Sequence, residues 1–327
     1  PGAEIPEVAM NSISKPIWFY GLESMAAQLL PPKEGRLRRI AFAQLALPGM
    51  ADAAQAMTRP EEELGRWSRA IPLWLGLVVN SVISSTFYMP MHEATHRNIM
   101  GKSARGRGVE DLIGRLASIP TGIQFSSHRA GHMRHHAYTN DPDRDPDHFT
   151  SGRMRELPAK FYGVTMLNAF LPVFALVRPT RVLLPAPIKQ KLASRDGSKE
   201  EGKAQLRFWL LTTVVLVVSA VTGRFAEAML LWWLPARIQF CWLMFIFAWY
   251  PHHPASETSR YRHTRVAVFR GSGMLIRGHD YHAIHHLFPR VPHYRLKHLW
   301  NELSSDLVDR GVRAEGRALG ATSPVVW

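Results

Sequence analysis

The chain has 327 residues and a formal net charge of +14, which leaves room for one large domain or two small ones. Its single cysteine, Cys241, lies in an apolar run, and this excludes a disulfide framework, a cysteine-ligated zinc site and a four-cysteine iron–sulfur cluster. The basic residues flank apolar segments and form no patch on a soluble fold, so the charge favours an anionic membrane surface over nucleic acid as a partner. The first residues lack the charged-then-apolar pattern of a secretory signal.

Three apolar segments are each about 20 residues long, which is enough to cross the hydrocarbon layer of a membrane. They are residues 71–91, 206–223 and 226–250. Residues 40–57 form a weaker candidate because Pro48 and Asp52 interrupt them. Residues 161–177 are shorter, and we expect them to cross the membrane or to lie in its interface as an amphipathic helix. Arg237 interrupts the last long segment, so we expect it to snorkel or to face a cavity.

The loop charges predict which side of the membrane each segment faces. Basic residues follow the segment 71–91, precede the segment 206–223 and are frequent after Tyr250, whereas the loop between Met57 and Ala70 carries three glutamates. Lys and Arg concentrate in cytoplasmic loops. This pattern therefore predicts that the acidic loop faces away from the cytoplasm.

These features predict an all-α, multi-pass integral membrane protein that forms a single domain over residues 1–327. About four helices would cross the membrane. Two segments would form a helical cap on the cytoplasmic side, and these are residues 92–160 and 251–327.

Most of the sixteen histidines lie in or beside three short clusters. The clusters read His92-Glu-Ala-Thr-His96, His132-Met-Arg-His135-His136 and His282-Ala-Ile-His285-His286. Residues three or four apart share a helix face, so each cluster presents two or three imidazoles in one direction. A closed zinc site takes about four ligands, so eight imidazoles indicate two metal ions. Imidazole without thiolate suits iron, zinc, copper or nickel.

No carboxylate stands at ligand spacing, so we expect acidic groups to surround the metals and to hold the ring N–H groups of the ligands. The run 140–148 (NDPDRDPDH) supplies four aspartates directly after the second cluster. Asp141 and Asp145 are the two that we expect to reach its imidazoles, and Glu93 and Asp280 lie inside or beside the other clusters. The alternative interpretation is a solvated turn rich in Pro and Asp. An EF-hand calcium loop is disfavoured, since its glycine and bidentate glutamate are missing.

The three clusters together resemble the histidine boxes of the integral-membrane fatty acid desaturase and hydroxylase superfamily. Members of that superfamily bind two irons through an HxxxH box and two HxxHH boxes. Residues 282–294 (HAIHHLFPRVPHY) are similar to the third box of acyl-lipid desaturases. Residues 132–148 and 251–254 (PHHP) are closer to carotenoid ketolases and hydroxylases of the same superfamily. The resemblance extends from about residue 71 to residue 299.

This resemblance implies that nine histidines ligate two iron ions and that no other residue is catalytic. The implied ligands are His92, His96, His132, His135, His136, His252, His282, His285 and His286. The PHHP match places one ligand at His252, with His253 as its alternative. His128, His263 and His279 lie nearby in the sequence and are candidates for the outer shell.

The resemblance also implies an O2-dependent oxidation of a lipid C–H bond. The third box favours desaturation of a fatty acyl chain, and the second box with PHHP favours hydroxylation or ketolation of a carotenoid as the alternative. No His-Pro-Gly-Gly haem motif of a fused cytochrome occurs, so we expect a separate ferredoxin, or a cytochrome with its reductase, to supply electrons. A histidine-rich membrane metal transporter is the alternative of a different class. Transporters place ligands near the bilayer midplane, whereas these clusters lie at the ends of the apolar segments.

Overall fold

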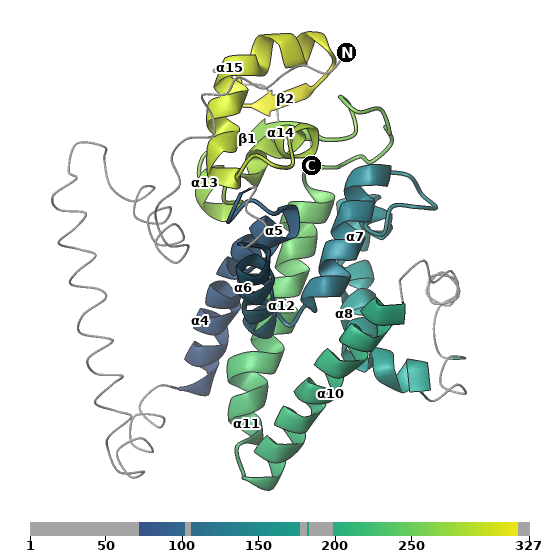
Figure 1. Ribbon diagram of the computed structural model, residues 1–327, viewed down its shortest axis with the longest axis vertical. Coiled ribbons are helices and arrows are strands. Elements are labelled where there is room, and N and C mark those ends of the chain that lie inside the picture. The colour runs from purple at the N-terminus through teal and green to yellow at the C-terminus, as the bar shows by residue number, and fades with distance from the viewer. Residues whose placement is uncertain (1–71, 102–105, 177–181, 183–198, 320–327) are drawn as a thin grey trace, which may run out of the picture. The chain divides into compact units, whose positions relative to one another are not determined.

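The computed structural model describes residues 72–101, 106–176, 182 and 199–319. This part of the chain is mainly helical, with one sheet of two strands (Figure 1). The predicted helical class is therefore confirmed, apart from that small sheet. The crossing predicted at residues 40–57 lies outside the described residues.

Two helices that meet at Phe87 form the first candidate membrane span. They are α4 (Leu73–Thr86) and α5 (Tyr88–His96). The combined helix is long and apolar enough to cross a membrane, and α4 exposes Val78 and Val82 among other apolar side chains. By contrast, nearly all of α5 is buried. The span therefore changes from a lipid-compatible surface to a protein-packed one as it approaches the first histidine cluster.

Two further helices have the length and composition of membrane spans. One is α10 (Lys199–Val221). The other is a composite of α11 (Phe225–Ala228), η5 (Met229–Trp233), α12 (Leu234–Leu243) and η6 (Met244–Trp249). Gly223, with a φ of +71°, forms the tight turn between them, where a side chain would be strained. All three candidate spans coincide with the segments predicted at 71–91, 206–223 and 226–250, while the total number of crossings and the cap remain predictions.

α8 (Leu157–Leu176) covers most of the segment predicted at 161–177. It contacts both neighbouring spans. The Thr165 hydroxyl lies 3.3 Å from the sulfur of Cys241, and the Trp209 indole donates to the carbonyl of Ala169. Whether this helix crosses the membrane or lies in its interface remains a prediction.

Two helices that lead from the first histidine cluster to the second, which lies on the later helix, form a hairpin. They are α6 (Gly106–Thr121) and α7 (Phe125–Tyr138). Gly114 allows this close packing, because a Cβ there would lie 2.3 Å from the ring of Phe125. Arg237 of the third span donates to the carbonyl of Gly122 in the turn. Its guanidinium therefore stabilises a backbone turn.

The C-terminal part packs short helices on a parallel pair of strands. Its elements are β1 (Arg265–Val268), α13 (Ser272–Leu275), η7 (His279–Tyr281), α14 (His282–Leu287), η8 (His293–Arg295), α15 (Leu296–Asp309) and β2 (Arg313–Gly316). Arg265 pairs with Arg313 in the strand register, and the Arg265 guanidinium donates to the buried carboxylate of Glu315 at 2.8 Å. The buried side chains of Ile284 and Trp300 belong to one small hydrophobic core, which also includes Val266 of β1. This core fixes α14, the helix of the third histidine cluster.

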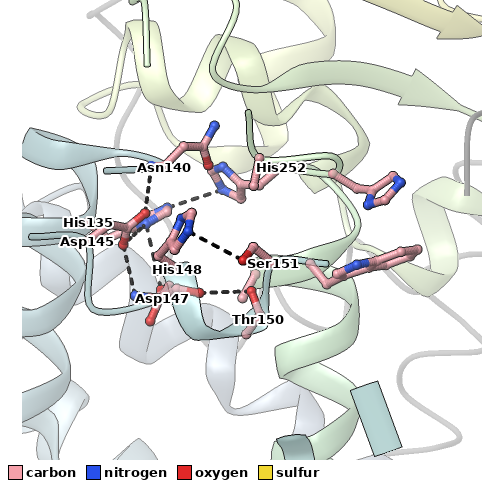
Figure 2. Close-up of a pocket in the computed structure, with 12 residues that line it drawn as sticks. His135, Asn140, Asp145, Asp147, His148, Thr150, Ser151 and His252 are labelled. Atoms are coloured by element: carbon pink, nitrogen blue, oxygen red, sulfur yellow. Dashed lines mark hydrogen bonds and ion pairs between the residues drawn. The ribbon is translucent and has the colours of Figure 1, made fainter. Parts of the chain in front are cut away.

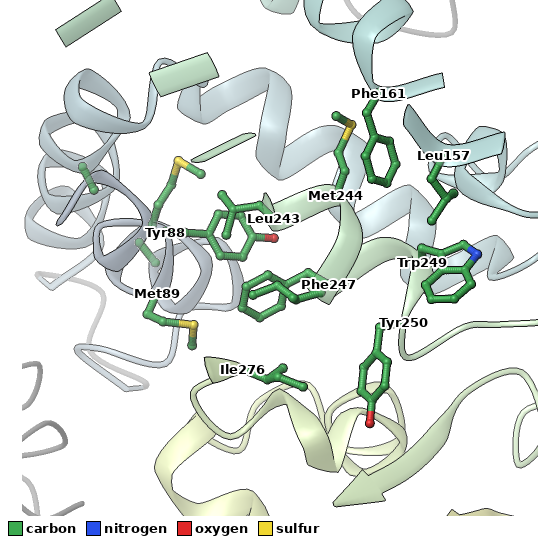
Figure 3. Packing of buried hydrophobic residues seen from close by; sticks show 14 of the residues in the cluster. Tyr88, Met89, Leu157, Phe161, Leu243, Met244, Phe247, Trp249, Tyr250 and Ile276 are labelled. Carbon is green, nitrogen blue, oxygen red and sulfur yellow. The ribbon is translucent and has the colours of Figure 1, made fainter. Parts of the chain in front are cut away.

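A larger apolar core joins the first and third candidate spans (Figure 3). The rings of Tyr88 and Phe247 pack in a tilted arrangement with centroids 4.7 Å apart, and Leu243, Met244 and Trp249 belong to the same buried cluster. Two short 3-10 turns precede α8 in the connection after the second histidine cluster, η2 (His148–Thr150) and η3 (Met154–Glu156). The larger core reaches the histidines, because the Tyr88 ring lies 5.8 Å from that of His92 and the Phe247 ring lies 4.5 Å from that of His279.

Candidate metal centre

Four separate segments carry the predicted ligands to one place. His92 and His96 lie one turn apart on α5, with ring centroids 4.8 Å apart. The second cluster lies on α7 and the third on α14. His252 follows η6, where its backbone N–H donates to the carbonyl of Trp249. The C-terminal ends of two candidate spans therefore meet two short helices of the remaining chain.

The first group of histidines combines residues from all three clusters. It comprises His92, His96, His132 and His285, which are buried and whose ligand atoms all lie within 4.8 Å of one another. The Nε2 atoms of His132 and His96 are 2.8 Å apart. The Nε2 atom of His92 is buried and has no hydrogen-bond partner within the described residues. An ion at this position would satisfy that nitrogen.

The second group combines the remaining ligands with the residue after the last span. It comprises His135, His252, His282 and His286, again with ligand atoms within 4.8 Å of one another. The Nε2 atom of His252 lies 3.2 Å from that of His135 and 3.0 Å from that of His282. The Nε2 atoms of His286 and His282 are 3.1 Å apart.

His136 lies between the two groups. Its Nε2 atom is 3.1 Å from that of His132 and 3.0 Å from that of His285. Its ring stacks on the ring of His286 at 4.1 Å. All nine histidines that the sequence singled out therefore lie in one continuous cluster.

The spacing of these nitrogens fits metal ligation. Two nitrogens that each bind one ion at about 2.1 Å are roughly 3.0–3.4 Å apart. The distances of 2.8–3.2 Å between ring nitrogens come close to that range. The donor set is imidazole alone, which suits iron, zinc, copper or nickel, so the residues present fit two such ions.

Burial keeps most of these rings in the form that can ligate. Outside the candidate spans, burial and the neighbouring imidazoles together hold the pKa values of six rings well below the ordinary histidine value. These are His132, His136, His252, His282, His285 and His286. A metal binds neutral imidazole, so the protein prepares these side chains for ligation before an ion arrives.

His135 differs because carboxylates face its outer nitrogen. Burial alone would lower the pKa of His135, but the hydrogen bond to Asp145 and the charges of Asp147 and Asp145 outweigh it, and the pKa is raised. The buried Asp145 carboxylate lies 2.8 Å from Nδ1 of His135 and also accepts from the backbone N–H groups of Asn140 and Asp147. Figure 2 shows Asp145 between His135 and the Asn140 backbone. This carboxylate fixes the orientation of the ring and leaves Nε2 to the metal.

Asp141 occupies a different environment. Its carboxylate binds the Arg144 guanidinium at 2.8 Å and accepts from the backbone N–H groups of Asp143 and Arg144 at 3.0 Å. The adjacent guanidinium lowers the pKa of Asp141. The structure therefore places Asp145 beside a histidine ring and places Asp141 in the solvated turn that the sequence offered as the alternative.

The remaining candidate histidines surround the cluster and belong to neither group. His128 stacks on His132 at 5.4 Å, and burial, with the charge of His92 adding to it, lowers its pKa to about 3. His263 meets the edge of His286 at 5.1 Å, and burial first, then nearby charges, lower its pKa to about 4. His279 is fully buried, with its ring 4.7 Å from that of His92.

His253 is separated from the nitrogens of the second group, although it is adjacent to His252. Its ring packs on Trp249 at 4.7 Å. Its backbone carbonyl accepts from Arg313 at 2.9 Å. Of the two neighbours, only His252 belongs to a candidate metal group.

Two outer contacts complete the surroundings of the rings. The Thr139 hydroxyl lies 3.2 Å from Nδ1 of His286, a contact across 147 positions of sequence that no motif signals. The Glu93 carboxylate lies 3.4 Å from Nδ1 of His92 and 3.5 Å from Nδ1 of His293. Asp280, the other acidic residue beside a cluster, accepts from the Ser272 hydroxyl at 2.7 Å.

The fold and the site together define a helical protein with two adjacent all-imidazole groups that could hold metal, at the ends of candidate membrane spans. Comparison of the sequence with known families identifies the family that has these features. The family model described as fatty acid desaturase matches residues 68–315, which is more than half of the chain. The chain belongs to the fatty acid desaturase family, as the histidine clusters predicted.

Individual relatives are distant. The chain is 24% identical over 254 residues to a probable fatty acid desaturase of Sorghum bicolor, with 71% of this chain and 64% of the relative covered. It is 32% identical over 111 residues to an sn-1 oleoyl-lipid 12-desaturase of Anabaena variabilis, with 30% and 31% covered. It is 23% identical over 253 residues to an sn-1 acyl-lipid omega-3 desaturase (ferredoxin) of Nostoc sp. (strain 36), with 68% and 66% covered.

In each of these three comparisons the match covers less than two thirds of the relative's length. The family and the relatives indicate an oxidoreductase. Together with the three long apolar helices, they support a membrane protein. The histidine groups add a site that could bind metal.

Proposed function

We propose that this chain is a multi-pass membrane enzyme that uses dioxygen to introduce a double bond into a fatty acyl chain of a lipid. The observation that carries the proposal is the pair of buried four-histidine groups in a chain of the fatty acid desaturase family. The pair is consistent with a centre of two metal ions.

The ligand proposal follows the two groups. One iron would be held by His92, His96, His132 and His285, and the other by His135, His252, His282 and His286. The position of His136 beside the first group favours it as the ninth ligand. When bound, the two irons would supply the activation of dioxygen and the removal of hydrogen from carbon.

The protein's own side chains orient the site and exclude water from it. Asp145, Glu93 and Thr139 hold the outer nitrogens of three rings, which directs the inner nitrogens toward the metals. Tyr88 and Phe247 close the apolar side of the cluster, with the Tyr88 ring 5.8 Å from that of His92 and the Phe247 ring 4.5 Å from that of His279.

The partners of the reaction follow from the relatives and from the charge. Relatives of cyanobacterial and plant origin are named as ferredoxin-type desaturases, and this favours a separate ferredoxin as the electron donor over a cytochrome. The basic loops beside the candidate spans favour a metal centre on the cytoplasmic side. An electron carrier of the cytosol would then have access to it.

Two alternatives remain distinct from acyl desaturation. Carotenoid hydroxylation or ketolation rests on residues 132–148 and PHHP, but the relatives are named as oleoyl-lipid or acyl-lipid desaturases. Metal transport is disfavoured because both groups lie at the ends of spans, whereas transport sites lie near the midplane.

Expression in a host of defined lipid composition tests the proposal. We expect a new unsaturated acyl chain in gas chromatography with mass spectrometry, and we expect it to disappear in His285→Ala. A hydroxylated acyl chain would identify the chain as a hydroxylase. Altered carotenoids without altered acyl chains, in a host that makes both, would overturn the acyl-lipid proposal.

A further inference from the structure

The hairpin of α6 and α7 has a turn that the third candidate span holds by three side chains. The Trp232 indole donates to the carbonyl of Ile119 at 2.9 Å, and Gln239 donates to that of Thr121 at 2.6 Å. Arg237 donates to the carbonyl of Gly122 at 3.0 Å. The backbone carbonyls at the end of a helix lack partners within the helix, so these donors supply partners from within the protein.

The position of these donors sets the depth of the turn. Their span runs from Phe225 to Trp249 and has 25 residues. Arg237 lies at its centre, twelve residues from either end (237 − 225 and 249 − 237). At about 1.5 Å per residue, this is about 18 Å from each end. A turn held at that level lies within the hydrocarbon layer of about 30 Å if the span crosses it.

The chemistry of the hairpin fits such a depth. Residues 116–127 (LASIPTGIQFSS) contain no charged residue and no histidine. In a bilayer, irregular backbone is tolerated only where protein groups satisfy its polar atoms, and the three donors above satisfy three carbonyls at the turn. Gly122, with a φ of +63°, permits the tight reversal.

One face of α6 is apolar and uncovered by the described protein. Val109, Leu112, Leu116 and Ile119 follow helical spacing, and each is 45–56% exposed. The opposite face is buried against the protein, including Gly114 beside Phe125. Water would make this exposed stripe unfavourable, whereas acyl chains would not.

The charged residues of the same helix all precede its last six residues. Glu110 and Asp111 pair with Arg97 at 3.5 Å and 3.0 Å, and Asp111 also pairs with Arg129 at 2.8 Å. Arg115 is exposed beside the stripe, and its long side chain could carry its charge toward the headgroups. The helix α6 is therefore charged near Arg97 and apolar near the turn.

We propose that α6 and α7 form a re-entrant hairpin, which enters the bilayer from the side of the metal centre and returns to it with the second histidine cluster. Acyl chains of the surrounding lipids contact the exposed stripe of α6. Figure 1 shows α6 beside α5 and α7 rising from the turn, and α6 contacts α4, α5 and α12. This places part of the predicted cap, residues 92–160, within the membrane. The proposal rests on the membrane character of the protein and is independent of its reaction.

Spin labels on single cysteines test this depth in the full chain, in a Cys241→Ser background and in lipid vesicles. The labelled positions are Val109, Leu112, Leu116 and Ile119. Oxygen partitions into the hydrocarbon and a nickel chelate into water, so their relative collision rates report depth. We expect Ile119 to be deeper than Val109, by up to about 15 Å for a helix along the membrane normal. Leu211 on α10 serves as the deep reference and Asn301 on α15 as the aqueous one.

Each other outcome overturns the proposal in a recognisable way. Equal shallow depths at the four positions would mean that α6 lies flat in the interface. High nickel accessibility throughout would mean that it faces water, and low accessibility to both reagents would mean that a protein surface covers it. A water-like value at Leu211 as well would overturn the membrane assignment itself.

Discussion

The carboxylate of Asp145 lies 2.8 Å from Nδ1 of His135 and is buried with it. The same carboxylate accepts from the backbone N–H groups of Asn140 and Asp147. The loop after the second histidine cluster therefore folds around one carboxylate, and that carboxylate fixes one proposed ligand of the second group.

Asp145→Asn should weaken metal retention because the amide cannot offer two acceptor oxygens to the same ring and backbone groups. Loss of such an outer contact typically lowers metal affinity or activity by about 10–100-fold. Asp141→Asn is the matched control, since Asp141 binds Arg144 and the turn amides. Metal content after dialysis against a chelator measures the difference. Equal retention in the two variants would remove Asp145 from the surroundings of the metal.

His252→Ala should lower metal content, whereas His253→Ala should leave it near that of the parent. Only His252 places a ring nitrogen within 3.2 Å of other members of the second group, while the His253 ring packs on Trp249. Iron analysis of the two purified variants decides between the neighbours. Loss confined to His253→Ala would show that the ligand is His253.

Gly114→Ala should destabilise the hairpin, because the added Cβ would lie 2.3 Å from the Phe125 ring. Overpacking of this kind costs about 1–3 kcal/mol. Gly108→Ala on the same helix is the control, since no atom lies within 4 Å of its Cβ, and alanine there favours the helix by about 0.5–1 kcal/mol. Thermal unfolding in detergent should give a lower Tm for Gly114→Ala only. A Tm equal to that of Gly108→Ala would contradict the close packing of α6 on α7.

A cysteine at Thr222, in the exposed turn between α10 and α11, should react with an impermeant thiol reagent added to intact cells. A cysteine at Asn301 on α15 should react only after the membrane is opened. Both changes are made in a Cys241→Ser background. The proposed orientation follows from the basic loops next to the histidine clusters. The reverse labelling pattern would place the metal centre outside the cytoplasm.

Local spacing accounts for the part of the site that the sequence could predict. Histidines three and four residues apart share one helix face, so the pairs on α5, α7 and α14 follow from the sequence. The family follows from the same clusters, and the match over residues 68–315 confirms it. The three candidate spans follow from their length and apolar composition.

Long-range packing accounts for what the sequence could not predict. The partition of the clusters into two groups depends on how four segments meet, and so does the contact of Thr139 with His286. The role of Arg237 also depended on a partner far along the chain, the carbonyl of Gly122, 115 positions away. Asp141 and Asp145 have the same chemistry, and only the course of the loop separates the solvated carboxylate from the buried one.

The iron content of the purified protein tests the central proposal most directly. With iron measured per chain, we expect about two ions in the parent, since a site of this kind takes about four ligands. We expect about one ion in a variant that lacks His92 and His96, and about one in a variant that lacks His252 and His282, because each pair belongs to one group. Exchangeable zinc in place of iron, or an unchanged iron content in both variants, would contradict a centre built from two histidine groups.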